Sequence, residues 1–93
     1  MRIGLCEGRH EIPQIKDYIF PADFFSEPGS MFDFKRMQGR ISQKLMSENE
    51  IHVYVTGLTV ALVEVIKYCQ DRNIILTLWH FDRESGQYIP QFV

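Results

Sequence analysis

The sequence predicts a small α/β protein, with a Rossmann-like, mostly parallel sheet, two main helices and a C-terminal antiparallel β-hairpin. Three observations support this fold class. Short apolar runs of strand length alternate with two stretches of helical periodicity. The apolar run 51–56 breaks at Gly57 and continues as a helix, and the C-terminal residues turn back around Gly86. Strand–helix–strand units cross over right-handedly, which leaves either a two-layer half-Rossmann or a three-layer sandwich.

The first half of the chain is predicted to hold two short strands and one long helix. The strands are Arg2–Cys6 and Tyr18–Phe20, the second of them stopped by Pro21. The loop that follows ends at Ser30, which is a good N-cap residue.

A helix is expected to follow Ser30, because apolar residues then recur at steps of three and four. Those residues are Met31, Phe34, Met37, Ile41 and Leu45. Gly39 lies inside this helix at a cost of about 1 kcal/mol relative to alanine. It either permits close packing or is a tolerated defect.

The second half is predicted to contain a strand at 51–56, a helix at 58–72, and strands at 74–81 and 87–93. Pro90 marks the last strand as an edge strand. The helix is apolar on nearly every side, so we expect burial on more than one face. One face should pack on the sheet and another on a second subunit, which predicts a homodimer. The alternative is that the first helix or the Phe-rich loop covers it.

Composition and charge exclude several classes of protein. Ninety-three residues, 45% of them hydrophobic, make a single domain spanning 1–93. A net charge of −2 with scattered basic residues does not fit a double-stranded nucleic-acid binder. No apolar run approaches the roughly 20 residues that cross a bilayer, and no signal peptide is evident, so a cytoplasmic protein without membrane contact is expected. Cys6 and Cys69 are predicted to be buried thiols, and the sequence indicates neither a metal site nor a cofactor.

A ligand site is predicted where the strand at 51–56 passes into the following helix. The carboxyl ends of parallel strands share one edge of the sheet, and a helix N-terminus favours an anion there. The loop after the first strand should lie at the same edge, although the sequence does not establish that both share one pocket. The predicted ligand-binding residues are Glu7, Arg9, His10, Thr56, Gly57 and Thr59. The alternative is that Thr56-Gly57 only makes a tight turn and the loop is only solvated.

The C-terminal hairpin is a second, weaker candidate. Trp79-His80-Phe81 places aromatic rings on alternate faces, and Arg83 or Tyr88 could contact a ligand from the rim of the site. The competing interpretation is a solvated turn with cross-strand aromatic pairs. His52 is predicted to be an ordinary sheet residue on the same face as Tyr54.

Three stretches of sequence carry a resemblance. They are Ile-Gly-Leu-Cys-Glu-Gly-Arg-His-Glu-Ile, Val-Tyr-Val-Thr-Gly-Leu-Thr-Val-Ala-Leu-Val and His-Phe-Asp-Arg-Glu-Ser-Gly-Gln-Tyr. Together they resemble a family of small uncharacterised proteins of Gram-positive phages and mobile elements. The resemblance to this family implies no biochemical activity. More remotely, the Thr-Gly-Leu-Thr junction looks like the ligand edge of CRISPR-associated Rossmann-like (CARF) domains. That likeness implies a dimer that binds cyclic oligonucleotides, by analogy of fold alone.

Three functions follow from these observations. The first is a dimeric binding module for a small anionic ligand, such as a nucleotide, at Thr56–Thr59. The second is a phage or mobile-element protein that acts through protein–protein contacts. The third is a metal-independent phosphodiesterase with His10 as the acid or base, so whether the protein is an enzyme stays open.

Overall fold

The computed structural model describes residues 1–8 and 11–93. Within them the secondary structure follows the predicted order. Its elements are β1 (Arg2–Cys6), β2 (Tyr18–Phe20), the 3₁₀ turn η1 (Ser30–Phe32), α1 (Phe34–Leu45), β3 (Glu50–Tyr54), α2 (Thr59–Asp71), β4 (Ile75–Asp82) and β5 (Gln87–Phe92). The predicted α/β fold class is confirmed.

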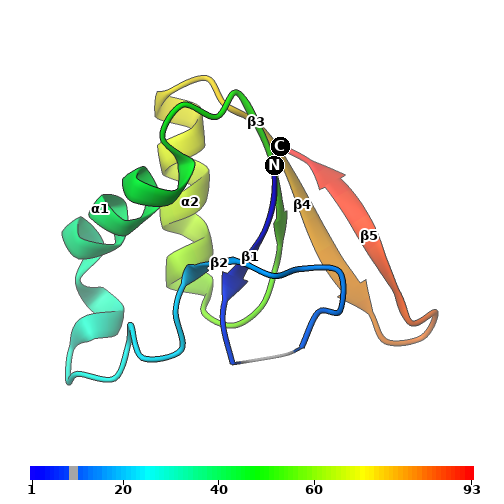
Figure 1. The fold of residues 1–93 in the computed structure, drawn as a ribbon, viewed down its shortest axis with the longest axis horizontal. Helices are drawn as coiled ribbons and strands as arrows, with labels where there is room; N and C mark the ends of the chain where they lie inside the picture. The colour runs from blue at the N-terminus through cyan, green and yellow to red at the C-terminus, as the bar shows by residue number, and fades with distance from the viewer. Residues whose placement is uncertain (9–10) are drawn as a thin grey trace.

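The described strands form one sheet in the order β2-β1-β3-β4-β5. The first four strands are parallel, and β5 pairs antiparallel with β4. Both α1 and α2 lie on the same side of this sheet (Figure 1). The fold is therefore the two-layer alternative, and the opposite face of the sheet carries no helix among the described residues.

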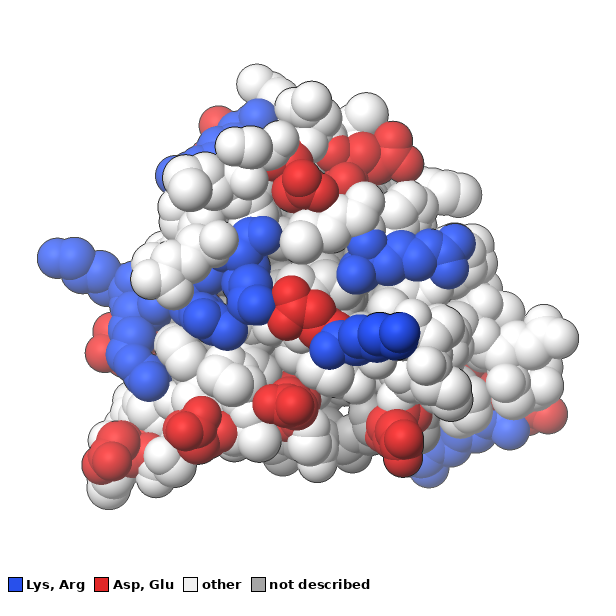
Figure 2. Space-filling model, viewed as in Figure 1, with Lys and Arg blue, Asp and Glu red and all other residues white. Residues whose placement is uncertain are grey.

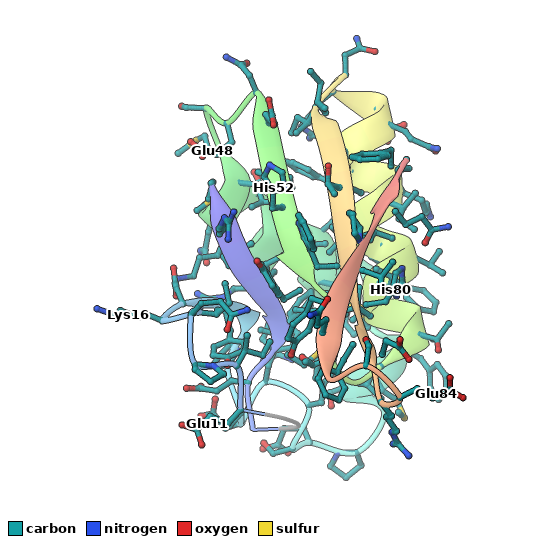
Figure 3. All side chains as sticks on the ribbon, turned by 90° about the vertical axis from the view of Figure 1, so that its right-hand side faces the viewer. Glu11, Lys16, Glu48, His52, His80 and Glu84 are labelled. Carbon is teal, nitrogen blue, oxygen red and sulfur yellow. The ribbon has the colours of Figure 1, made fainter. Side chains whose placement is uncertain are left out.

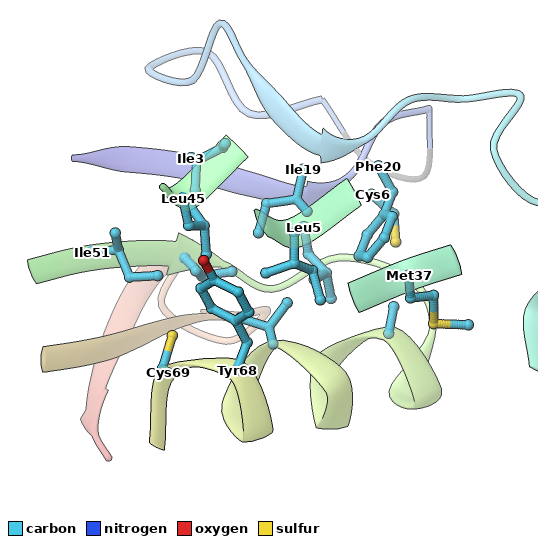
Figure 4. Packing of buried hydrophobic residues seen from close by; sticks show 14 of the residues in the cluster. Ile3, Leu5, Cys6, Ile19, Phe20, Met37, Leu45, Ile51, Tyr68 and Cys69 are labelled. Carbon is cyan, nitrogen blue, oxygen red and sulfur yellow. The ribbon is translucent and has the colours of Figure 1, made fainter. Parts of the chain in front are cut away.

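Alternation along the strands decides what faces the helices. Ile3 and Leu5 of β1 and Ile51 and Val53 of β3 have no exposed surface, and all four belong to the main hydrophobic core. Figure 4 shows this core between the sheet and α2. Successive side chains of a strand point to opposite faces, so the residues between these positions lie on the helix-free face.

The first helix begins later than the sequence suggested. Asp33, rather than Ser30, caps α1, and its carboxylate accepts a hydrogen bond from the Arg36 backbone N–H at 3.1 Å. The chain from Ser30 forms only the short turn η1. Met31 in this turn and Phe34 at the start of α1 are 37% and 44% exposed. The predicted apolar stripe is correct only from Met37 onward.

The second helix ends in a hydrogen-bonded C-terminal motif. Asn73 has a positive φ of 55°, and the Ile74 and Asn73 N–H groups donate to the carbonyls of Cys69 and Gln70. This is the Schellman arrangement, in which a left-handed residue lets the chain turn back over the last helical turn. It directs the chain straight into β4.

One flank of α2 is covered by α1. The Gln38 side-chain amide of α1 donates to the backbone and side-chain oxygens of Glu64 in α2, at 2.9 and 3.1 Å. Glu64 is 4% exposed and its carboxylate lies 3.4 Å from Lys67 Nζ. The alternative that the first helix covers part of the apolar helix is thus correct, while Val63 of α2 remains 46% exposed.

Two further sequence expectations have outcomes in the structure. Cys6 and Cys69 are buried thiols and form no disulfide. Burial raises the pKa of the Cys69 thiol to about 11, which keeps it protonated and unreactive at neutral pH. Among the described residues, no helix is long and apolar enough to cross a membrane.

Candidate functional site

The predicted strand–helix junction is built largely for structure. Thr56 is 6% exposed, and its hydroxyl donates to the Cys6 carbonyl at 2.8 Å and accepts from the Cys6 N–H at 3.1 Å. These bonds join the ends of β1 and β3 where the regular ladder between them stops. Both hydrogen-bonding roles of the hydroxyl are therefore filled by the protein itself.

Gly57, Thr59 and Glu7 are the other predicted residues at this edge that the structure describes. Gly57 has a φ of 84°, which a glycine adopts readily, and Thr59 is exposed as the first residue of α2. Glu7 accepts a hydrogen bond from the Ala22 N–H at 3.2 Å. Its carboxylate is therefore directed toward the segment after β2.

Arg9 and His10 lie outside the described residues, so the combined site at this edge stays a prediction. A hollow of about 270 Å³ does lie beside Glu7. Its described lining is Cys6, Glu7, Gly8, Pro21, Ala22, Phe25 and Ser26, which does not include Thr56, Gly57 or Thr59.

A larger groove, of about 550 Å³, lies on the helix-free face of the sheet. It is lined by Arg2, Glu11, Pro13, Gln14, Tyr54, Trp79, Phe81, Gly86, Gln87 and Tyr88. We call this the open-face groove. Figure 3 looks onto this face, with Glu11 and the segment 11–17 along one side and the β4–β5 hairpin along the other.

Aromatic rings from three strands form the floor of the open-face groove. Tyr54 of β3 stacks on Trp79 of β4, with an interplanar angle of 11° and centroids 5.8 Å apart. Tyr88 of β5 contacts Tyr54 edge-on at 5.0 Å and Phe81 at 5.3 Å. The predicted cross-strand aromatic pairing is thus present. The same rings also line a groove. Cross-strand aromatic pairs and a residue at the rim of a groove, the two interpretations of the hairpin, therefore occur together.

Gly4 allows the Tyr18 side chain to pack directly against β1 on this face. Gly4 of β1 lies directly beneath the Tyr18 ring, and a β-carbon at this position would overlap that ring. Tyr18 packs with Ile12, Ile15 and Tyr54 in a small second cluster on the helix-free side. This cluster holds the segment 11–15 against the sheet beside the open-face groove.

Polar groups surround the aromatic floor. Arg2 Nη1 donates to the Tyr54 hydroxyl at 3.1 Å, and the side chains of Glu11, Gln14 and Gln87 complete the lining. The groove therefore contains a cation, a carboxylate and two amides. Both hydrogen-bond donors and acceptors are present beside flat rings.

The Tyr88 hydroxyl is buried, and none of the described residues forms a hydrogen bond with it. Burial raises the pKa of the Tyr88 phenol, and the neighbouring Tyr18 and Tyr54 phenols add to the effect. The phenol consequently stays neutral over the physiological range.

Charged side chains of both signs lie on the surface of the molecule. On the side of the molecule shown in Figure 2, basic side chains lie mainly across the middle, and acidic side chains lie along the lower edge, near the top and between the basic groups. No group of three or more metal-binding side chains is found among residues 1–8 and 11–93.

Comparison with known proteins adds no relative. No family model, curated protein or solved structure matches the chain.

The sequence analysis missed the open-face groove as a whole, although it singled out Tyr88. The signal that could have found it is the composition of the strands. Strands of a parallel sheet covered on both faces are almost continuously apolar. Here His52 and Tyr54 alternate with core residues in β3, and Trp79 and Phe81 do so in β4.

Proposed function

We propose that the protein is a binding module for a small planar ligand of the nucleotide class, which it takes up in the open-face groove. The observation that carries this proposal is a mostly parallel sheet with one helix-free face that bears a groove of about 550 Å³ with an aromatic floor. Parallel sheets are normally covered on both faces. A surface that departs from this pattern, with aromatic and polar side chains, is the natural place for function.

The class of ligand follows from the chemistry of the lining. Phe81 is 40% exposed and offers a ring on which a flat ligand can stack. Gln14 and Gln87 each carry a donor and an acceptor, as the edge of a nucleobase does. Arg2 supplies a cation suited to a phosphate. The volume of the groove lies within the usual range for small-molecule sites, roughly 300–1,000 Å³.

The proposed ligand is still the nucleotide expected from the sequence, but its proposed site is the open-face groove instead of the Thr56–Thr59 junction. The Thr56 hydroxyl is committed to Cys6, whereas the open-face groove combines stacking surfaces and hydrogen-bonding groups. A phosphodiesterase that uses His10 stays a prediction, because that residue lies outside the described part of the chain.

The test is a titration with the four ribonucleoside 5′-monophosphates. Binding is monitored through the fluorescence of Trp79, the single tryptophan of the chain. We expect at least one of the four nucleotides to change the emission and saturate. Phe81→Ala should weaken binding roughly tenfold, because stacking of one base on a ring contributes about 1–3 kcal/mol.

Phe92→Ala is the matched control for this titration. Phe92 pairs with Thr77 on the same face of the sheet, is 80% exposed and does not line the groove. It should bind like the unaltered protein. Equal losses in the two variants, or no response to any of the four nucleotides, would contradict the proposed function.

We also propose a homodimer formed through α2, in the cytoplasm. The exposed Val63 and the half-buried Val60, Leu62 and Ile66 support an apolar contact on this helix. Pairing through the edge of β5 is disfavoured. Val93 N–H donates to Leu76, so by alternation Pro90 is at an outward-facing position and offers no N–H to a further strand.

Sedimentation equilibrium of the protein and of Val63→Glu tests the dimer. A dimer that Val63→Glu converts to a monomer supports it, and a monomeric parent protein refutes it. The second function expected from the sequence, a phage or mobile-element protein that acts on a protein partner, would use the same apolar surface of α2. A monomeric parent protein with no ligand in the nucleotide titration would favour that function.

A further inference from the structure

A short row of hydrogen bonds crosses the helix-free face beside the open-face groove. The Trp79 indole Nε1–H donates to His52 Nδ1 at 3.0 Å, and His52 Nε2 lies 3.1 Å from the Glu50 carboxylate. His52 and Trp79 are neighbours on adjacent strands, with ring centroids 6.1 Å apart. His52 lies on the strand face turned toward the viewer in Figure 3.

The chemistry of these groups determines where the imidazole proton lies. An indole nitrogen is a donor only, so His52 Nδ1 must supply a lone pair. A neutral imidazole then carries its proton on Nε2, where the Glu50 carboxylate accepts it. Every partner in the row is satisfied in this one tautomer. A second proton, on Nδ1, would set two N–H groups against each other.

We infer that His52 is a positioning residue for the open-face groove, which holds the Trp79 indole in place as a neutral imidazole and releases it when protonated. Trp79 lines the groove and stacks on Tyr54, whose hydroxyl is in turn bound by Arg2. The orientation of the indole therefore helps to define the floor on which a ligand would lie. Only this link to binding rests on the proposed function.

The charged groups around His52 act in opposite directions. The Glu50 carboxylate favours the protonated imidazole. Arg2, which is the register partner of His52 on β1, disfavours it, as does the N-terminal ammonium group, which lies 3.4 Å from the Glu50 carbonyl. From β4 the facing side chains are Thr77, the register partner of His52, and Trp79, and neither titrates near neutral pH.

The consequence is a pH-dependent groove. Imidazoles ordinarily gain their second proton between about pH 8 and pH 5. When the His52 imidazole takes up a second proton the indole loses its acceptor, and we expect nucleotide affinity to fall by roughly tenfold, which corresponds to about 1.4 kcal/mol.

The experiment uses the protein without ligand, so that it does not depend on the proposed function. The chain has a single tryptophan, and the indole N–H of Trp79 therefore gives one resonance in a ¹H–¹⁵N spectrum. The spectrum is recorded from about pH 8 to pH 5 for the unaltered protein, His52→Ala, His52→Asn and His80→Asn. Asparagine places its amide oxygen near the position of Nδ1 and does not titrate, so it should preserve the acceptor.

We expect the indole resonance of the unaltered protein to move in one titration step toward the position it has in His52→Ala. The resonance of His52→Asn should stay near its position in the unaltered protein at the alkaline end and should not titrate. His80→Asn removes a histidine that contacts Gln91 instead, and it should titrate like the unaltered protein. Solvent exchange of the indole proton should be roughly tenfold faster in His52→Ala at alkaline pH, and no faster at acidic pH.

The inference is overturned if His52→Asn shows the same titration step as the unaltered protein, or if the unaltered protein shows none. Should His52→Ala fail to fold, the comparison between His52→Asn and His80→Asn decides. A titration step at His52 in a protein that binds none of the four nucleotides would refute the proposed function and leave the positioning role intact.

Discussion

The two faces of the sheet are made by the same strands and have opposite characters. In β4, Leu76 and Leu78 face the helices and are 2% and 3% exposed, while Phe81 on the other face is 40% exposed. The helix-covered face is apolar and closed. The helix-free face combines stacked rings, charged side chains, amides and a groove.

This contrast separates the core that stabilises the domain from the face on which we propose ligand binding. Burial of aliphatic side chains on one face supplies most of the folding free energy. The other face makes a smaller contribution and retains polar groups, among them the Tyr88 hydroxyl, which lacks a hydrogen bond among the described residues. Alternation along a strand can therefore place a closed core and a polar, grooved surface on opposite sides of one sheet.

The largest expected effect comes from truncating the same strand on its two faces. Leu78→Ala should lower the free energy of unfolding by about 2–5 kcal/mol, because it leaves a cavity in the main core. Phe81→Ala should cost within about 1 kcal/mol, since the ring is partly exposed. Urea unfolding of both variants measures the difference, and similar losses would mean that the two faces contribute alike.

A second pair of variants compares two glycines. Gly4→Ala should destabilise the protein by roughly 1–3 kcal/mol, because the added methyl group overlaps the Tyr18 ring. Gly39→Ala should stabilise it by roughly 0.5–1 kcal/mol, since nothing lies within 4 Å of that position on the exposed side of α1. The sequence left close packing and a tolerated defect open for Gly39, and the structure favours the defect. Thermal unfolding should show shifts of opposite sign, and a loss in both variants would contradict this interpretation.

The strand–helix junction can be tested with two threonines. Thr56→Val removes both hydrogen bonds to Cys6 and should cost roughly 1–2 kcal/mol in unfolding free energy. Thr59→Val changes an exposed residue and should alter stability by less than about 0.5 kcal/mol. If Thr59→Val nevertheless weakened nucleotide binding while Phe81→Ala did not, the ligand would lie at the junction predicted from the sequence.

The smallest expected effect concerns pH and a surface ion pair. Lys44 Nζ lies 2.8 Å from the Asp17 carboxylate, and this hydrogen bond lowers the pKa of Asp17 below its ordinary value of 3.8. A carboxyl pKa that is lower in the folded protein than in the unfolded chain stabilises the fold at pH values above the unfolded-state pKa. This stabilisation is lost as the pH falls through the folded-state pKa. Because the pair is solvent-exposed, we expect about 0.5 kcal/mol or less.

Unfolding of Asp17→Asn compared with the parent protein measures this contribution. The two proteins should differ near neutral pH and converge as the pH falls below about 3.8. A difference that grew on acidification would contradict the assignment.

Much of the fold could be predicted because each element carried a local signal. The short apolar run of β1 and the Pro21 stop predicted the bounds of the first two strands as the structure has them. The start of α1 was wrong because Ser30 and Asp33 are both good caps, and the sequence does not show which one the chain uses. The open-face groove could not be assembled from local signals. Arg2, Gln14 and Gln87 are distant in sequence and meet only through the order of the strands.

Ligand binding on the helix-free face is tested most directly by a map of backbone amide shifts on adding the four ribonucleoside 5′-monophosphates. We predict that the perturbed ¹H–¹⁵N resonances are those of Trp79–Phe81, Gln87–Tyr88 and the Trp79 indole, on the helix-free face. Perturbations restricted to Gly57–Val60 would place the ligand at the N-terminus of α2 and contradict binding in the open-face groove.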